Sequence, residues 1–193
     1  MNQWWQYWPN YFDPTQCDKL IELAKQIPET TGQIGHAANR AITDTNVRRS
    51  RLRWLPRNDS AFYTLFCTVN QLFHEANKNA FGFDLDRFHE VQFTEYHAED
   101  RGAYGWHHDT QWASPKLIRR KLSMVVQLSE HSDYSGGNFE MHPEGCDEVV
   151  DPGTIRSRGT VLVFPSFLRH RVTPVEAGVR YSLVTWMEGP FFR

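Results

Sequence analysis

The 193-residue sequence lacks an excess of charge of either sign. Its 21 lysines and arginines are nearly balanced by 23 aspartates and glutamates, which leaves a formal net charge of −2. A nucleic-acid or membrane-surface partner usually requires a strongly basic field, so neither kind of partner is expected. The longest basic run, Val47–Arg53, is predicted to be a solvated edge of the fold.

Cysteine is scarce, and long apolar runs are missing. Cys17, Cys67 and Cys146 are odd in number and far apart, which excludes a zinc-ligand spacing and a disulfide framework. Cys17 and Cys67 fall on apolar faces of expected helices, where we predict that both are buried. The sequence start lacks the pattern of a signal peptide, and no apolar run approaches the length of a membrane span. These absences predict a cytoplasmic protein.

The residues that are present fit a single domain over residues 1–193. Aromatic residues make up 14% of the chain, and such residues usually fill cores and line pockets. We expect residues 1–87 to form a helical support with an opening strand near residues 47–55. Residues 88–193 are expected to form the β core. The aromatic start, Asn2–Trp8, is predicted to be a strand or turn packed on the core, with an oligomer contact as the alternative.

Two helices are predicted in the first half of the chain. The first has Asp13 as its N-cap and Pro14 at its first position, and it stops at Pro28. The second runs from about Ser60 to Phe81, and Gly82 ends it. Each helix carries an apolar stripe at helical spacing. Both stripes are therefore expected to pack on a flat apolar surface such as a sheet.

The second half reads as strands separated by turns. Apolar and polar residues alternate in several of these segments, which is the pattern of half-buried strands. A chain with helices first and many antiparallel strands afterwards favours an α+β barrel or sandwich with its helices on one side. The predicted strands are residues 88–97, 121–128, 137–141, 159–165, 169–175 and 179–187.

Two adjacent histidines and an aspartate stand together in the segment WHHDTQW. Side chains i and i+2 share one face of a strand, so His107 and Asp109 point into the same cavity and His108 points away. This pair is two thirds of a 2-His-1-carboxylate metal site, which is typical of non-haem Fe(II) oxygenases. The same H-x-[DE] pattern recurs at His97–Glu99 and His142–Glu144, so the tripeptide alone is a weak signal.

The missing ligand is predicted in the segment RHRVTPVEAGVRYS. If the chain turns at Val175–Gly178 as a hairpin, His170 on one strand faces Arg180 on the next, with Cβ atoms about 4.5–5.5 Å apart. A guanidinium just beyond a metal suits a short dicarboxylate that chelates the metal with its other end. Ser182 adds a hydroxyl donor on the Arg180 face. The other two H-x-[DE] sites are rejected because one contains a proline and the other runs into a turn.

Taken together, these residues resemble the iron(II)- and 2-oxoglutarate-dependent dioxygenases, and most closely the prolyl 4-hydroxylases and bacterial PKHD-type hydroxylases. The resemblance covers roughly Val47–Trp186. It rests on the H-x-D tripeptide and on His170 followed ten residues later by Arg180. The segments VRRSRLRWL, YHAEDRGAYGWHHD and SGGNFEM are similar to the opening strand, the approach to the H-x-D and the Gly-Gly turn of these enzymes.

The resemblance implies an α+β, mainly β fold: a double-stranded β-helix (jelly roll) with N-terminal helices packed on one sheet. It implies Fe(II), 2-oxoglutarate and O2 as cofactors, with ascorbate as a candidate reductant. The implied reaction hydroxylates a C–H bond, with a prolyl or other amino-acid residue of a peptide or protein as best guess, and releases succinate and CO2. The implied metal ligands are His107, Asp109 and His170, and the implied 2-oxoglutarate contacts are Arg180, Ser182 and Tyr96.

The substrate side of the site is less well defined by sequence. Trp106, Trp112, Arg49 and Arg51 are candidates for the substrate mouth, and Trp186 is expected in the pocket wall or in the core. Residues 28–46 and 113–120 are expected to be mobile loops that select the substrate. Two other functions stay open: a nucleic-acid base demethylase or hydroxylase of the same superfamily, and a jelly-roll binding module without turnover.

Overall fold

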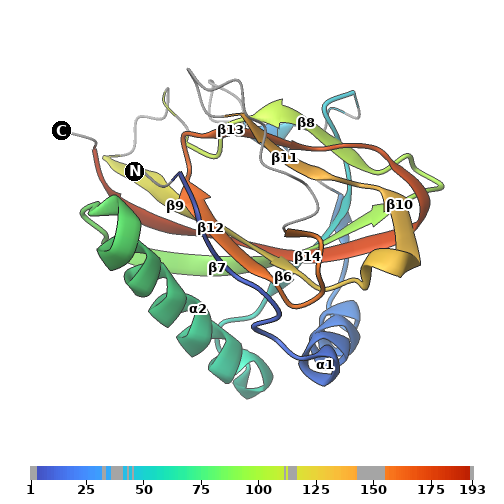
Figure 1. Cartoon of the computed structure of the whole chain (residues 1–193), viewed down its shortest axis with the longest axis horizontal. Coiled ribbons are helices and arrows are strands. Elements are labelled where there is room, and N and C mark those ends of the chain that lie inside the picture. Colours follow the sequence, from blue (N-terminus) through green and yellow to red (C-terminus); the bar gives the residue numbers. More distant parts are fainter. Residues whose placement is uncertain are drawn as a thin grey trace.

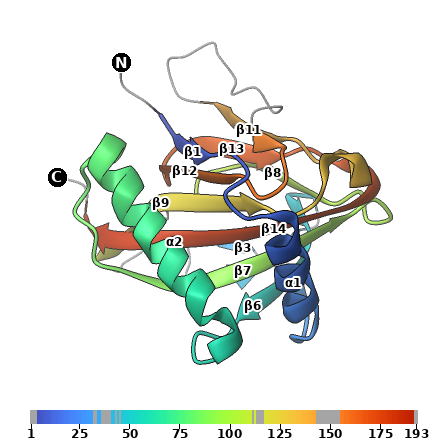
Figure 2. The same ribbon diagram turned by 60° about the horizontal axis from the view of Figure 1, so that its bottom comes forward.

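Two antiparallel β-sheets face each other, and two helices cover the outer surface of the larger sheet (Figures 1 and 2). The computed structural model describes residues 4–31, 34–35, 41–42, 44, 46–110, 112, 117–142 and 155–191. The arrangement is the α+β, mainly β jelly roll that the sequence predicts. Among the described residues, no helix is both long and apolar enough to cross a membrane.

The larger sheet supplies the floor of the sandwich, and all of its strands pair antiparallel. Its centre is the long strand β14, which pairs with β9 on one side and β7 on the other. A short additional strand, β10, pairs with the N-terminal end of β14. The order is β1 (Gln6–Trp8), β12 (Val161–Pro165), β9 (Ile118–Gln127), β14 (Val175–Pro190), β7 (Arg87–His97), β6 (Arg51–Leu55) and β2 (Thr30–Thr31), with β10 (Tyr134–Gly136) at the side.

The smaller sheet lies above the larger one (Figure 1). Its strands are β11 (Phe139–His142), β13 (Arg169–Val172), β8 (Ala103–His107) and β5 (Arg48–Arg49), in that order. A separate pair is formed by β3 (Ile34–Gly35) and β4 (Ala41–Ile42). The first 87 residues therefore provide edge strands to both sheets in addition to the helices.

The helices form where the capping residues place them. In α1 (Pro14–Lys25), the Asp13 carboxylate accepts from the Gln16 amide at 2.8 Å, and the Gln16 side chain accepts from the Asp13 amide at 2.9 Å. The second predicted helix comprises a 3₁₀ turn, η1 (Ser60–Phe62), then α2 (Tyr63–Ala76) and a π turn, η2 (Asn77–Phe81). Gly82 ends it with a φ of 65°, a conformation that glycine adopts without strain. A further short turn, η3 (His131–Asp133), precedes β10.

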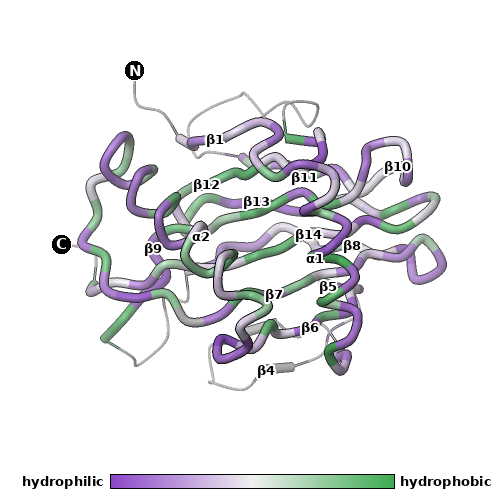
Figure 3. The backbone as a smooth tube through the Cα atoms, turned by 90° about the horizontal axis from the view of Figure 1, so that it is seen from below, coloured by the Kyte–Doolittle hydropathy of each residue, from purple (hydrophilic) through white to green (hydrophobic). Residues whose placement is uncertain are grey.

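The main core fills the space between the helices and the larger sheet. Leu122, Met124 and Val126 point from β9 towards this core and are fully buried, which confirms the predicted alternation. Figure 3 looks at this side of the molecule and shows hydrophobic stretches, in green, along β7 and β12. The apolar stripes of α1 and α2 are buried against this face, as the sequence predicts.

The predictions for the helix cysteines and for the aromatic N-terminus have different outcomes. Cys17 is buried as predicted, but the prediction for Cys67 is wrong because this side chain is exposed. The buried stripe of α2 runs through Phe66 and Val69, and Cys67 lies one residue, about 100°, off that stripe. The aromatic N-terminus confirms the simpler prediction, because β1 pairs with β12 and Trp8 packs against the main core.

The two predicted substrate loops lie partly outside the described residues. Within residues 28–46, the described residues include the short strands β2, β3 and β4, and β2 pairs with β6. For residues 113–120, the described part differs from the prediction, because β9 begins at Ile118 and not at Lys121. Cys146 also lies outside the described residues.

Candidate metal centre

Three side chains predicted as metal ligands meet between the two sheets. His107 is the last residue of β8, and His170 lies opposite it on β13. His107 Nε2 lies 3.7 Å from Asp109 Oδ1, and His170 Nε2 lies 3.4 Å from Asp109 Oδ2. One ligand atom from each of the three residues can be chosen so that all lie within 4.8 Å of one another. Neighbouring strands of the smaller sheet thus place two imidazoles and one carboxylate around a common point.

The hydrogen bonds of the two histidines leave the correct nitrogen available for a metal. His107 Nδ1 lies 2.7 Å from the Gly105 carbonyl oxygen, and His170 Nδ1 lies 2.8 Å from the Leu168 carbonyl oxygen. A carbonyl oxygen can only accept, so each Nδ1 must carry the proton. In the neutral form of each imidazole, Nε2 then presents its lone pair towards Asp109, which is the tautomer and orientation that metal-binding histidines show.

Charge and burial favour the protonation states that a metal requires. Burial, together with the neighbouring His170, lowers the pKa of His107 to about 3. Burial by itself would raise the pKa of Asp109, but the nearby His170 and His107 lower it to about 2. At neutral pH the site therefore offers a neutral imidazole at His107 and an ionised carboxylate at Asp109. Divalent metals bind these forms without first displacing a proton.

The three residues form part of the wall of a cavity of about 380 Å³ between the sheets. Strand β14 faces this cavity with every second side chain: Arg180, Ser182, Val184 and Trp186 all line it. The predicted alternation of this strand is thereby confirmed, and Trp186, for which both the pocket wall and the core were expected, lines the cavity. Tyr96, which pairs with Arg180 across β7 and β14, lines the same cavity.

Arg180 is a buried cation that faces the cavity. Its exposed fraction is 3%, and its guanidinium lies 5.7 Å from the ring centroid of Tyr96. Among the described residues it forms no ion pair, and the Ser182 Oγ is buried without a hydrogen-bond partner. An uncompensated buried cation is costly, and so is an unsatisfied buried hydroxyl. Both groups therefore indicate that the cavity receives an anionic ligand that accepts hydrogen bonds.

The predicted pairing of His170 with Arg180 is wrong, although both residues line the cavity. Strand β13 belongs to the smaller sheet and β14 to the larger one, so His170 lies opposite His107 and Met141, and Arg180 lies opposite Tyr96. The chain does not turn at Val175–Gly178, because β14 runs through this segment without interruption. The chain passes from the smaller sheet at β13 to the larger sheet at β14. His170 on β13 and Arg180 on β14 both line the cavity between the sheets.

Arg48 is a cavity residue that sequence reasoning missed. It is buried on β5, its Nε donates to Ser50 Oγ at 2.8 Å, and its guanidinium lies 4.5 Å from the ring centroid of Tyr104. Tyr104 in turn stacks on His107, with ring centroids 3.5 Å apart. The apolar Leu52, four residues after Arg48, was the available signal, because it marks the inward face of this segment.

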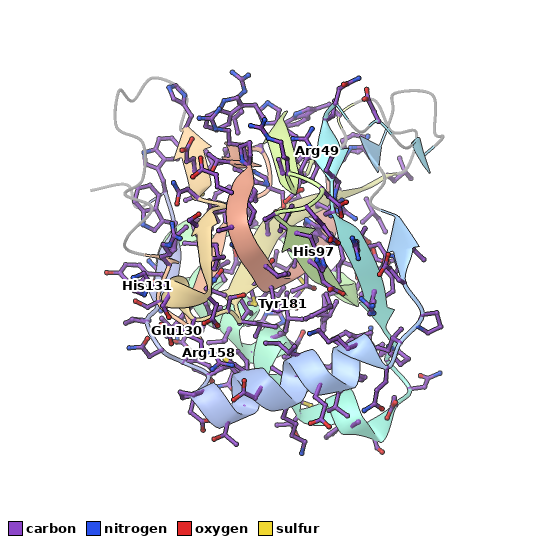
Figure 4. The ribbon with its side chains drawn as sticks, turned by 90° about the vertical axis from the view of Figure 1, so that its right-hand side faces the viewer. Arg49, His97, Glu130, His131, Arg158 and Tyr181 are labelled. Carbon is purple, nitrogen blue, oxygen red and sulfur yellow. The ribbon has the colours of Figure 1, made fainter. Side chains whose placement is uncertain are left out.

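The predicted mouth residues lie elsewhere. Arg49 (labelled in Figure 4) donates to the Arg101 carbonyl oxygen at 2.9 Å, and Arg51 pairs with Glu99 and Asp100 at 2.5 and 2.9 Å. Neither arginine contributes to the cavity wall. They occupy the face of the β5–β6 segment opposite to Arg48.

The two predicted mouth tryptophans are also off the cavity wall. Trp106 lies with its ring centroid 4.7 Å from the Arg171 guanidinium, and Trp112 is 59% exposed. The cavity is lined instead by Trp54 and Trp186, whose ring centroids are 6.4 Å apart. Trp54, two residues after Leu52, lies in phase with the inward face of its strand.

Three further histidines that the sequence analysis weighed lie outside the candidate ligand set. His108 is exposed, and its Nδ1 bonds to the Phe167 carbonyl oxygen. His97 (Figure 4) lies 3.0 Å from the Glu95 carboxylate and not near the metal centre. His142 is exposed, and the rest of its H-x-E tripeptide lies outside the described residues.

Fold and site together define a class of enzyme, and comparison with known sequences agrees. Residues 91–188, about half of the chain, match the family described as the 2OG-Fe(II) oxygenase superfamily. The chain belongs to this family. The matched region contains all three candidate ligands and Arg180.

Among individual proteins, the chain is similar to PKHD-type hydroxylases. It is 34% identical over 105 residues to one from Synechococcus sp. strain CC9902, an alignment that covers 54% of this chain and 43% of that protein. It is 37% identical over 89 residues to another from Synechococcus sp. strain CC9605, covering 45% of this chain and 36% of that protein. The chain thus aligns with about two fifths of the length of these relatives.

Solved structures share the fold over nearly the whole chain. A Pseudomonas putida prolyl-4-hydroxylase superposes with a TM-score of 0.70 at 22% identity, covering 95% of this chain and 92% of that one. A prolyl hydroxylase from Trichoplax adhaerens, solved with a peptide of hypoxia inducible factor, gives a TM-score of 0.73 at 19% identity, covering 95% and 83%. At these identities the likeness shows the fold alone.

Proposed function

We propose that this protein is an Fe(II)- and 2-oxoglutarate-dependent dioxygenase that hydroxylates a C–H bond and releases succinate and CO2. The observation that carries the proposal is the presence, in one cavity, of a 2-His-1-carboxylate set and a buried arginine without a carboxylate partner among the described residues. The donor set suits Fe(II) and leaves coordination positions open. We treat the chain as one catalytic unit, with ascorbate as a candidate reductant.

The keto acid end and the far carboxylate of 2-oxoglutarate match, respectively, the three candidate metal ligands and the Arg180–Ser182 pair. In the proposal, His107, Asp109 and His170 hold the metal, and the keto acid end of 2-oxoglutarate lies against it. The far carboxylate is bound by the Arg180 guanidinium and the Ser182 hydroxyl, two donors that lack acceptors among the described residues. Bound iron supplies the oxidation of 2-oxoglutarate and the activation of O2, and the protein supplies position and shielding.

The surroundings of the site favour a dry reaction chamber. Phe139 and Phe164 pack against the His170 ring, with centroids 5.5 and 4.9 Å away. Burial raises the pKa of Tyr96, so its hydroxyl stays protonated and can donate a hydrogen bond to bound 2-oxoglutarate. Exclusion of water would strengthen the contacts of Arg180 with bound 2-oxoglutarate and limit side reactions with water.

The proposed substrate is a prolyl, or another amino-acid, residue of a peptide or protein. Part of the cavity is lined by Trp54 and Trp186, with the Arg120 guanidinium 3.7 Å from the Trp186 ring and its Nη2 3.5 Å from the Glu90 carboxylate. The indole rings of Trp54 and Trp186 can pack against the saturated ring of a proline, and Arg120 and Glu90 can form hydrogen bonds with peptide groups of the substrate. The names of the similar PKHD-type and prolyl hydroxylases support this substrate class.

Succinate production tests the reaction. The protein is incubated with Fe(II), O2 and 2-oxoglutarate, and succinate is measured for the wild type and for Asp109→Ala. The wild type should form succinate, and the variant should not, because it lacks the carboxylate ligand. An Asp109→Ala protein that consumes 2-oxoglutarate at the wild-type rate would falsify the proposal. Cys67→Ser, at an exposed position on α2, is the matched control and should retain full activity.

A substrate panel separates the remaining functions. Prolyl peptides, free amino acids and methylated oligonucleotides are incubated with the active protein, and mass spectrometry detects the gain of one oxygen or the loss of a methyl group. Oxidation confined to the oligonucleotides would favour the base demethylase. A protein purified without chelators that binds neither a divalent metal nor 2-oxoglutarate would favour the binding module.

A further inference from the structure

Two buried serines meet behind the carboxylate of Asp109. Ser123, on β9, donates its hydroxyl to Asp109 Oδ2 at 2.6 Å, and Ser123 Oγ lies 2.9 Å from Ser166 Oγ. Ser166 follows directly after β12, which pairs with β9 at this point. Both serines are fully buried, so no bulk water competes for their hydroxyl groups. Ser123 lies on the same face of β9 as Val125, which lines the cavity between the sheets. A buried hydroxyl at such a position needs a polar partner.

The direction of both hydrogen bonds follows from counting donors. The ionised Asp109 carboxylate can only accept, so the single hydroxyl hydrogen of Ser123 is directed to it. The contact between the two serines must then use the hydrogen of Ser166, with Ser123 Oγ as acceptor. Ser166 therefore orients the Ser123 hydroxyl, and Ser123 orients the carboxylate.

The backbone closes this chain of hydrogen bonds into a ring. The Ser166 carbonyl oxygen accepts from the amide of Asp109 at 2.9 Å and from the amide of Thr110 at 3.1 Å. The Ser166 amide donates to the Lys121 carbonyl oxygen at 2.9 Å, which ties the segment to β9. The main chain and the side chain of Asp109 are thus both held by the same serine, directly and through Ser123.

We propose that Ser123, oriented by Ser166, is a positioning residue that fixes the rotation of the Asp109 carboxylate towards His107 and His170. The inference rests on the proposed function in that the bound ion is the divalent metal of that site. Without the Ser123 hydroxyl, the carboxylate loses its fixed orientation before metal arrives. Removing such a partner of a metal ligand typically lowers metal affinity 10- to 100-fold.

Cobalt(II) titration of the metal-free protein tests this role without turnover. Co(II) binding is followed by visible absorption, whose intensity reports the coordination geometry of the ion. Ser123→Ala should bind Co(II) about 10- to 100-fold more weakly and with an altered spectrum. Ser166→Ala should shift both readouts in the same direction by less, because the carboxylate keeps its direct donor. Ser123→Thr retains a hydroxyl and should restore most of the affinity.

Ser129→Ala is the matched control. Ser129 is also buried, but its hydroxyl accepts from the Tyr181 amide (Tyr181 is labelled in Figure 4) at 2.6 Å and lies beyond the end of β9. Its loss should leave Co(II) affinity and spectrum unchanged. Thermal unfolding of each metal-free variant separates folding from binding.

The outcomes distinguish this inference from the proposed function. Wild-type affinity and an unaltered spectrum for Ser123→Ala overturn the positioning role alone. If Ser123→Ala does not fold, Ser166→Ala decides, and wild-type binding by that variant overturns the role. A wild-type protein that binds no Co(II) overturns the proposed function and the inference with it.

Discussion

Arg180 should have opposite effects on ligand binding and on stability. The change considered is Arg180→Met, which removes the guanidinium and keeps most of the side-chain volume. Arg180 is 3% exposed and has no ion pair among the described residues, so the free protein bears the cost of a desolvated cation. An apolar residue of similar volume at such a position is neutral or stabilising. The metal-free variant should therefore be as stable as the wild type, or more stable.

The same change should greatly weaken 2-oxoglutarate binding. Truncating one partner of a buried, hydrogen-bonded charge pair costs about 2–5 kcal/mol. At about 1.4 kcal/mol per decade, this corresponds to a roughly 30- to 4000-fold rise in Kd. Arg180→Lys keeps the charge but loses the two-pronged geometry, so its Kd should lie between those of the wild type and the methionine variant.

Two measurements check this pair of effects. Calorimetry with Zn(II) in place of iron gives the Kd of 2-oxoglutarate without turnover, and urea unfolding gives the free energy of unfolding of the metal-free protein. The reasoning is refuted if Arg180→Met binds 2-oxoglutarate as tightly as the wild type. It is also refuted if the variant is destabilised by several kcal/mol, because Arg180 would then have a structural partner.

Three further predictions concern pH, backbone geometry and the cavity wall. His107 has a folded-state pKa of about 3 and an unfolded value near 6.5, so its contribution to stability is full above pH 6.5 and is lost as the pH falls towards 3. The metal-free protein should lose up to about 2 kcal/mol of unfolding free energy between pH 6.5 and 5 through this group. In urea titrations at several pH values, His107→Gln should show a smaller change of unfolding free energy with pH. Equal pH dependence of the two proteins would contradict the lowered pKa of His107. Gly159→Ala should destabilise the protein by more than about 2 kcal/mol, because φ is 76° and the new Cβ would lie 1.8 Å from the Phe12 carbonyl oxygen. At Gly82 φ is 65°, but no atom lies within 4 Å of an added Cβ, so Gly82→Ala should cost only about 1 kcal/mol of stability. If thermal unfolding shows equal losses of stability for the two alanine variants, the contact with Phe12 is unimportant. Trp186→Leu should raise the ratio of succinate to oxidised substrate, since the cavity wall is altered while Arg180 remains; an unchanged ratio would remove Trp186 from the substrate subsite.

The site could be predicted from sequence where a local rule was enough. Strand alternation assigns a face to each residue from its neighbours alone, and it selected His107 and Asp109 over His108. It also selected Arg180 and Ser182 on β14, which both line the cavity. The helix caps and the Gly82 stop were predictable for the same reason, because capping depends on residues three or four positions apart.

The parts that failed depend on contacts between distant segments. A hairpin was the simplest connection between the strands that carry His170 and Arg180, but the two strands lie in different sheets. Sheet assignment depends on pairing with β8, β11, β7 and β9, which no local pattern specifies. Arg48 was missed because Leu52 and Trp54, which mark the inward face of this segment, were not used to assign the faces of Arg48, Arg49 and Arg51.

Oxygen-isotope labelling tests the central claim most directly. The protein is incubated with Fe(II) and 2-oxoglutarate under ¹⁸O2, and the succinate formed is analysed by mass spectrometry, which requires no knowledge of the substrate. The account predicts that the succinate carries one ¹⁸O atom from O2 and that Asp109→Ala forms none. Unlabelled succinate, or labelled succinate from the variant at the wild-type rate, would contradict a dioxygenase centred on His107, Asp109 and His170.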